Sequence, residues 1–384
     1  MSSAAQWQQL ESRMTRTPGT CNTMGTASTM TGIVEALGLT LPGASSIPAM
    51  DAAHTRMATD CGARIVAMVS EDLKPSCILT AGSFDNAMAV QMALGGSTNA
   101  AIHVIALTLE RLDAVARRVP VIANLFPCGD RLMEDFHYAG GLPALMQVIR
   151  DELATTEMTV NGRTIGQNIE SATTLDAQVI RPLSDPVSSA GALAALQGNL
   201  APQGAVIKPC AASPNLMQHK GRALVFDSPP EMLAAMADEA LDCDENTVLV
   251  LRNAGPVSAP GMPEWGNLPI PKKLLKAGVR DMLRLSGTHF GTCVLHISPE
   301  SAQGGTLALV QTGDVIELDV AARRLHLHVG DAELAQRRAA WTRPAQPFRR
   351  GFTRLYQEHV TQAHEGCDFG FLQSTESTPE PAIF

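Results

Sequence analysis

Three residues in this sequence stand where a side chain could do chemistry: Cys21, Glu264 and Ser286. Cys21 lies in a turn of glycine and threonine, directly before the apolar periodicity of a helix. Unpaired backbone N–H groups and the positive end of the helix dipole favour a thiolate there, the form that ligates metals and attacks electrophiles. The alternative interpretation is a buried structural cysteine.

Glu264 is the only carboxylate in a glycine- and proline-rich loop, residues 253–266, that follows an apolar run. Rigid loops at strand ends often hold functional residues, so Glu264 is the natural ligand for a hard cation if one binds here. The alternative is a surface turn with a solvated glutamate. Both interpretations stay open on the sequence alone.

Ser286 lies between an apolar run and a glycine turn. No GxSxG motif and no nearby His/Asp pattern accompany it, so a hydrolase triad is not indicated. To act as a base or nucleophile, this serine would need a metal ion or a cofactor beside it. An ordinary turn serine is the alternative.

Two further segments collect glycines and polar side chains. Residues 94–99, LGGSTN, place backbone N–H groups before a helix and could bind an anion, although a capped helix start explains the same pattern. Residues 129–141, GDRLMEDFHYAGG, could line a polar pocket or form a solvated loop.

The composition limits the class of protein. The chain has 384 residues, a net charge of -9 and 45% hydrophobic residues, which fits a globular protein with a sizeable core. No basic stripe is present for nucleic acid, no apolar run is long enough for a membrane span, and the start lacks a signal-peptide pattern. We therefore expect a cytoplasmic protein with no nucleic-acid or membrane partner.

Hydrophobic periodicity predicts helices in the first half and strands in the second. A buried strand at 119–123 and the helices around it predict a partial α/β domain with a parallel sheet over residues 1–195. Residues 196–335 predict a β-barrel-like domain, and residues 336–384 a helical tail. The expected helices are Thr29–Leu39, Asp51–Ser70, Asn86–Leu94, Asn99–Ala116, Leu142–Leu153, Pro230–Leu241 and Pro271–Ala277; the expected strands are 205–208, 222–226, 247–251, 292–297, 315–320 and 325–329.

Taken in order, several stretches between residues 17 and 372 resemble the dihydroxy-acid dehydratase/6-phosphogluconate dehydratase family. They are GTCNTMGTASTM, ALGGSTNAAIH, LMEDFHYAGGLPALM, GNLAPQGAVIKP, LVLRNAGP, PGMPEWG and SGTHFGTCVLHISPES. A tail of the GFTRLYQEHVTQAHEGCDFGFL type is similar to the sugar-acid (aldonate) branch of that family.

This resemblance implies a hydro-lyase that dehydrates a sugar acid, or a related 2,3-dihydroxy acid, to the 2-keto-3-deoxy acid. It implies an iron–sulfur cluster, [2Fe-2S] or alternatively [4Fe-4S], and a Mg2+ ion. Cys21 matches a cluster ligand, Glu264 a magnesium ligand, and Ser286 the base that removes the proton from C2. The implied partner is a small sugar-acid substrate, and a homo-oligomer is expected.

Family members bring two further cluster cysteines, one of them in a Cys-Asp-Lys motif, in an N-terminal segment that this sequence lacks. The sequence therefore predicts an N-terminally truncated dehydratase with impaired activity. The alternative is an inactive remnant or a non-enzymatic partner subunit. Loss of that segment also predicts bare apolar faces beside Cys21, on the helices around Met30–Leu39 and Ala87–Leu94.

Overall fold

The computed structural model describes residues 3–4, 6–8, 18–104, 108–260, 268–285, 291–345 and 348–373. These residues form two compact units. Unit 1 comprises residues 1–100 and 115–192, and unit 2 comprises residues 101–114 and 193–384. Among the described residues, no helix combines the length and apolar composition that crossing a membrane requires.

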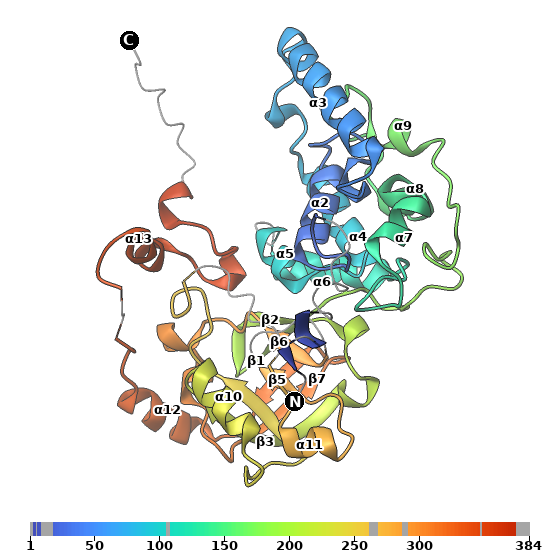
Figure 1. Cartoon of the computed structure of the whole chain (residues 1–384). Coiled ribbons are helices and arrows are strands. Elements are labelled where there is room, and N and C mark those ends of the chain that lie inside the picture. The colour runs from blue at the N-terminus through green and yellow to red at the C-terminus, as the bar shows by residue number, and fades with distance from the viewer. Residues whose placement is uncertain are drawn as a thin grey trace. The chain divides into compact units, whose positions relative to one another are not determined.

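Unit 1 is helical (Figure 1). Helices α7 and α9 were not expected, and α7 lies in the 129–141 segment that the sequence analysis took for a loop. Its helices are α2 (Thr26–Ala36), α3 (Ala52–Glu71), α4 (Ala81–Ala93), α7 (Met133–Tyr138), α8 (Gly141–Val148) and α9 (Ile165–Ile169), with 3-10 turns η1 (Ala44–Ser46), η2 (Pro75–Cys77) and η3 (Arg150–Glu152). The expected helix at Asn99–Ala116 is instead two helices, α5 (Thr98–Val104) and α6 (Leu109–Arg118).

Helix α4 is the buried centre of unit 1. Thr80 caps its first turn by accepting a hydrogen bond from the Ser83 N–H at 3.1 Å, while Ser83 Oγ accepts one from the Thr80 N–H at 2.9 Å. Every residue of Ala87–Leu94 is at most 1% exposed, and α2 packs against this helix with Ile33 also at 1%. The expected bare faces on these two helices are therefore wrong, because α2 and α4 cover one another.

The expected parallel sheet in unit 1 is also wrong for the residues that the structure describes. The segment at 119–123 is extended and buried, but it forms only isolated antiparallel bridges, Val121 to Ser188 and Ala123 to Ile180. The N–H groups of Ile122 and Ala123 both donate to the carbonyl of Ala93 at 3.0 Å. These donors are thus taken by the end of α4 rather than by a neighbouring strand.

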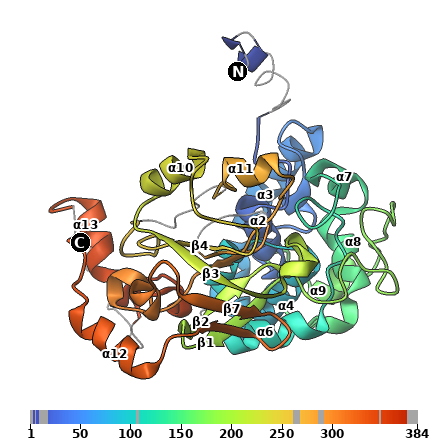
Figure 2. The same cartoon turned by 90° about the horizontal axis from the view of Figure 1, so that it is seen from below.

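Unit 2 contains a closed β-barrel, which confirms the barrel-like prediction (Figure 2). Two of its strands, β1 and β5, were not expected from the sequence. The strands, in chain order, are β1 (Ala194–Gly198), β2 (Ala201–Ile207), β3 (Gln218–Phe226), β4 (Val248–Leu251), β5 (Arg284–Leu285), β6 (Cys293–Leu295), β7 (Val315–Asp319) and β8 (Arg324–Leu327).

The barrel mixes parallel and antiparallel pairs in the order β1-β2-β6-β5-β4-β3-β7-β8. Strands β3, β4, β5 and β6 run parallel to one another, so their carboxyl ends lie along the same edge. Strands β2 and β7 flank this group in the antiparallel direction, and β1 closes the barrel against β8. This edge matters because three chain segments of the candidate site begin there.

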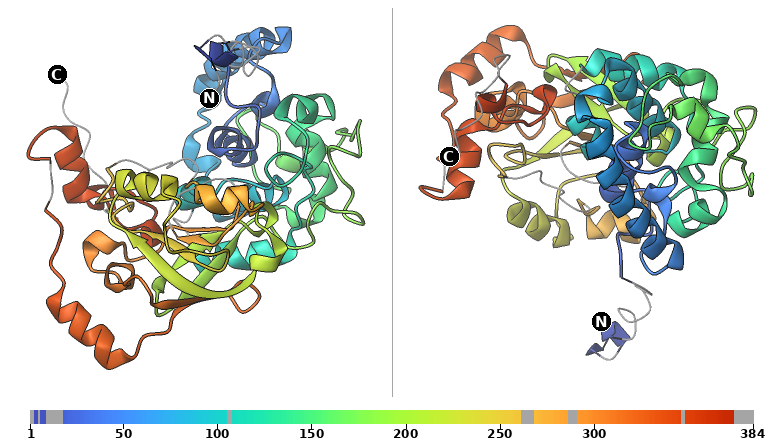
Figure 3. Two further views of the ribbon diagram at one scale, coloured as in Figure 1. Left: turned by 60° about the horizontal axis from the view of Figure 1, so that its bottom comes forward. Right: turned by 90° about the horizontal axis from the view of Figure 1, so that it is seen from above.

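Two apolar clusters hold unit 2 together. The larger fills the barrel with aliphatic side chains such as Leu196, Val250 and Leu325, each fully buried. The smaller joins β3 and β4 to the two short helices α10 (Pro229–Ala237) and α11 (Lys272–Lys276), which lie side by side outside the barrel (Figure 3). The remaining 3-10 turns of the barrel region are η4 (Pro209–Ala211), η5 (Pro214–Leu216), η6 (Ser301–Gln303) and η7 (Thr306–Leu309).

The C-terminal tail of unit 2 is helical, as expected. Arg337 fixes its first helix to the barrel by donating from Nη2 to Asp314 at 3.1 Å and from Nη1 to the Leu309 carbonyl at 3.0 Å. The tail consists of α12 (Asp331–Ala340), α13 (Phe352–His359), η8 (Ala363–Glu365) and η9 (Gly370–Leu372).

Residues 101–114 also belong to unit 2. Asp113 pairs with Arg323 Nε at 2.8 Å and accepts the N–H of Ala195 in β1 at 3.3 Å. Leu109 occupies the space beside Gly204, where a Cβ would lie 2.4 Å from Leu109 Cδ1. This early segment is thus part of the barrel's packing.

Candidate functional site

Cys21 is exposed, which excludes the interpretation as a buried structural cysteine. Its neighbour Asn22 fixes the turn to the start of α7. The Asn22 carbonyl accepts the N–H of Met133 at 3.2 Å, and its Oδ1 accepts the N–H of Glu134 at 3.0 Å. The cysteine turn and the polar 129–141 segment, far apart in sequence, therefore meet in unit 1.

The LGGSTN turn meets the same region through α2. The hydroxyls of Thr26 and Ser97 lie 2.8 Å apart, and the Ser97 N–H donates to Thr29 Oγ1 at 3.0 Å. Gly96 permits this approach, since a Cβ there would lie 2.8 Å from Gln91 Cγ and 2.9 Å from Thr29 Cγ2. Three of the segments singled out in the sequence thus form one region of unit 1.

That region does not complete a cluster site. Cys21 contributes one thiol, and within the described residues no three His, Cys, Asp or Glu side chains gather in a way that could hold a metal ion. An iron–sulfur cluster needs several thiolate ligands. The residues that the structure describes therefore do not fit the expected cluster.

Glu264 and Ser286 lie outside the described residues, whereas the strands that precede them lie within the described part of the chain. Leu251 ends β4, from which the loop of Glu264 departs, and Leu285 ends β5, directly before Ser286. The two strands are parallel neighbours, with Val250 opposite Leu285. The carboxyl ends of these two strands therefore lie at the same edge of the barrel, where α/β sheets commonly bind ligands.

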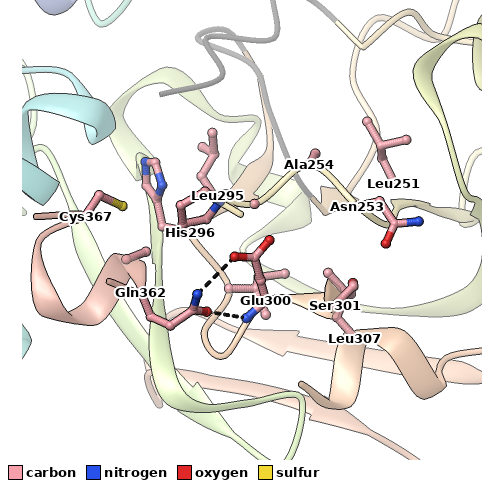
Figure 4. A pocket seen from close by; sticks show the side chains of 14 residues that line it. Leu251, Asn253, Ala254, Leu295, His296, Glu300, Ser301, Leu307, Gln362 and Cys367 are labelled. Atoms are coloured by element: carbon pink, nitrogen blue, oxygen red, sulfur yellow. Dashed lines mark hydrogen bonds between the residues drawn. The ribbon is translucent and has the colours of Figure 1, made fainter. Parts of the chain in front are cut away.

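A small cavity of about 40 Å3 lies at this edge (Figure 4). Ligand pockets usually span roughly 300–1,000 Å3, whereas about 10–15 Å3 suffices for one water molecule, so this cavity can take only a few water-sized groups. Its polar lining consists of Asn253, His296, Glu300, Ser301, Gln362 and Cys367.

His296 follows β6 directly and is a residue that the sequence analysis missed. Its φ of 56° is unusual for a residue with a side chain, and such conformations concentrate at functional sites. Burial, and secondarily the charge of His103, lowers the pKa of His296 to about 4, so the ring is neutral near pH 7. Its buried Nε2 and the Ser301 hydroxyl have no hydrogen-bond partner among the described residues.

Cys367, another residue of the cavity lining, is held as a thiol. Burial raises its pKa to about 12, and the charges of Glu300 and Glu365 act in the same direction. The thiolate is the reactive form, so Cys367 is not a nucleophile near neutral pH. Glu300 is the acidic residue of the cavity lining and a second residue that the sequence analysis missed. It accepts hydrogen bonds from the loop that follows β4.

Two family models match this chain, one over its first part and one over its second. Residues 1–168 match the dihydroxy-acid/6-phosphogluconate dehydratase N-terminal family, and residues 178–367 match the C-terminal family of the same name. The chain belongs to the dihydroxy-acid/6-phosphogluconate dehydratase family. Its curated relatives are dehydratases, that is, hydro-lyases.

Several relatives in this dehydratase family act on sugar acids by name. The chain is 55% identical to 6-deoxy-6-sulfo-D-gluconate dehydratase of Pseudomonas putida, over 98% of this chain and 68% of the relative. It is 46% identical to L-arabinonate dehydratase of Rhizobium leguminosarum bv. trifolii, over 96% and 66%. It is 41% identical to a dihydroxy-acid dehydratase of Ignicoccus hospitalis, over 91% and 65%. The chain thus spans about two thirds of the length of these relatives.

Proposed function

We propose that this chain is a hydro-lyase that converts a sugar acid, an aldonate or a related 2,3-dihydroxy acid, to the 2-keto-3-deoxy acid. The observation that carries the proposal is the identity of 55% and 46% to two named sugar-acid dehydratases, extending over both units. The lower identity of 41% to a dihydroxy-acid dehydratase favours the sugar-acid branch.

In this proposal Ser286 takes the proton from C2 of the substrate and the hydroxyl group leaves C3. One water molecule is lost, and the resulting enol becomes the ketone of the product. Glu264 is assigned to magnesium, the role that the resemblance implies. Cys21 matches a cluster ligand by the same resemblance but supplies only one thiol, so no step of the proposal is assigned to a cluster. The barrel supports a shared task for Glu264 and Ser286, because their segments depart from adjacent parallel strands.

A second candidate function is a catalytically inactive remnant or a partner subunit of another chain. The observation in its favour is the ligand set: among the described residues Cys21 stands without two further metal-binding side chains. The two candidates differ in what the purified chain contains and does.

The deciding experiment measures iron, labile sulfide and turnover on the purified full chain, reconstituted with iron, sulfide and Mg2+. L-Arabinonate and 6-deoxy-6-sulfo-D-gluconate are the substrates, and the 2-keto-3-deoxy product is quantified by mass spectrometry. A hydro-lyase is expected to form product that the Ser286→Ala variant does not. If the chain by itself binds substoichiometric iron and forms no product, the second candidate is favoured. Turnover that appears only after a full-length relative is added would favour the partner subunit. Light scattering on the same sample tests the expected homo-oligomer.

A further inference from the structure

The carboxylate of Glu300 lies on the floor of the cavity and is bound entirely by neutral donors. The residue is 3% exposed. Its oxygens accept the N–H of Val257 at 2.8 Å, the N–H and O–H of Ser258 at 3.1 and 2.8 Å, and Nε2–H of Gln362 at 2.9 Å. A buried carboxylate is stable only when such donors satisfy it. Glu300 and the loop after β4 are therefore fixed to one another.

Gly255 makes this close approach possible. A Cβ at that position would lie 2.4 Å from Glu300 Oε2 and 2.5 Å from Glu300 Cβ. Both of these contacts are far shorter than van der Waals distance, so any side chain at residue 255 would displace the carboxylate from the loop. The glycine and the carboxylate are complementary parts of one contact.

The C-terminal segment binds the same place from the other side. Gln362 forms two hydrogen bonds with Glu300: its Oε1 accepts the Glu300 N–H at 2.9 Å, and its Nε2 donates to the carboxylate (Figure 4). Gln357 of α13 is 7% exposed and donates from Nε2 to the carbonyl of Val257 at 2.9 Å. Two amides of the tail thus reach the root of the loop, directly or through Glu300.

We propose that Glu300, Gln357 and Gln362 form a clasp by which the C-terminal segment positions the loop after β4 for dehydration. The inference rests on the proposed function, because the loop matters for catalysis through Glu264, six residues beyond Ser258 in the sequence. The three residues of the clasp are positioning residues: Glu300 and Gln357 bond the loop directly, Gln362 acts on it through Glu300, and none of them is assigned to the substrate.

Amide hydrogen exchange followed by mass spectrometry tests the clasp on the full chain. The N–H groups of Val257 and Ser258 donate to the Glu300 carboxylate, which Gln362 holds in place. Glu300→Gln weakens that acceptor and Gln362→Leu releases it, so each variant is expected to speed exchange in peptides covering residues 255–258 by about tenfold. Exchange in β7 and β8 should not change. Glu358→Gln is the matched control, because the exposed Glu358 lies on α13 but pairs only with Arg354, on the same helix, among the described residues.

Unchanged exchange at residues 255–258 in folded Gln362→Leu would overturn the clasp. If Glu300→Gln does not fold, the exchange result of Gln362→Leu alone decides whether the clasp exists. Where the wild-type chain turns over an aldonate, Gln362→Leu should lower kcat about tenfold with KM within about twofold, because misplacement of the loop weakens the transition state more than binding. Equal losses in Glu358→Gln would also overturn it. Absence of turnover in the wild type contradicts the proposed function instead, and leaves the exchange result to decide the clasp.

Discussion

Lys208 follows the last residue of β2 and is only 7% exposed. Burial lowers the pKa of its ammonium group to about 7, against 10.5 for the free side chain. Between pH 7 and pH 10.5 the Lys208 amine is protonated in the unfolded chain and neutral in the folded chain. The free energy of unfolding therefore rises with pH in this window, by up to about 1.4 kcal/mol per pH unit. Below pH 7 both states are protonated and this contribution is constant.

Lys208→Met should therefore abolish the rise in unfolding free energy between pH 7 and 10, and raise stability at pH 7 by about 1 kcal/mol or more. Urea denaturation at several pH values measures both effects. Lys220→Met is the control, since Lys220 is exposed on β3. A pH dependence that survives in Lys208→Met would show that another group causes it.

Gly96 carries a second prediction at the scale of single residues. Gly96→Ala forces the new methyl group against Gln91 and Thr29, and should destabilise unit 1 by about 1–3 kcal/mol. Gly62→Ala is the matched control in α3, where a Cβ would have no neighbour within 4 Å. Because alanine has the higher helix propensity, Gly62→Ala should instead raise the free energy of unfolding by about 0.5–1 kcal/mol. The thermal midpoints of both variants check the contrast.

Helices α3 and α4 differ completely in how they are covered. None of the 20 residues of α3 is buried, and Val69 is 79% exposed, whereas Val90 in α4 is fully buried. Val90→Glu should lower the unfolding free energy by about 3 kcal/mol or more, since it buries a charge without a partner. Val69→Glu should change it by less than about 0.5 kcal/mol. A large loss at Val69 would mean that another surface covers α3 in solution.

Most helices could be predicted from the sequence because their apolar periodicity is long enough to see. Strands β1 and β5 could not: β1 reads AALQG, with little strand propensity, and β5 has two residues. Both exist because neighbouring strands pair with them, a tertiary effect that overrides local preference. The predicted sheet around 119–123 failed for the complementary reason, since local extended character does not supply a partner strand.

In the candidate site, too, features that are local in the sequence could be predicted, whereas long-range contacts could not. Cys21, Glu264 and Ser286 are predicted site residues that rest on motifs, which are local in the sequence. The bond between Glu300 and Gln362 joins residues 62 positions apart, and no pattern in either segment predicts it. An acidic residue inside the apolar stretch CVLHISPES was the one available signal for Glu300.

At the scale of the whole molecule, the barrel depends on a segment from the first third of the chain. Asp113 pairs with Arg323, and both side chains are largely shielded, at 14% and 20% exposure. Asp113→Ala leaves the guanidinium and the Ala195 N–H without this acceptor, and should destabilise unit 2 by about 1–3 kcal/mol. Asp185→Ala, in an ion pair whose Asp185 side chain is 70% exposed, should cost less than about 0.5 kcal/mol. Chemical denaturation of the two variants measures the difference, and equal losses would contradict it.

The segment 101–114 also bears on the order in which a ribosome makes this protein. Asp113 emerges 210 residues before Arg323, its partner in the barrel. Asp113 therefore cannot meet Arg323 until the rest of unit 1 and most of unit 2 have been synthesised, whereas Leu109 meets its neighbour Gly204 earlier. Chaperones that bind exposed apolar chain should find residues 101–114 available throughout that interval, and a nascent chain stalled before residue 323 should retain this segment in a protease-sensitive form.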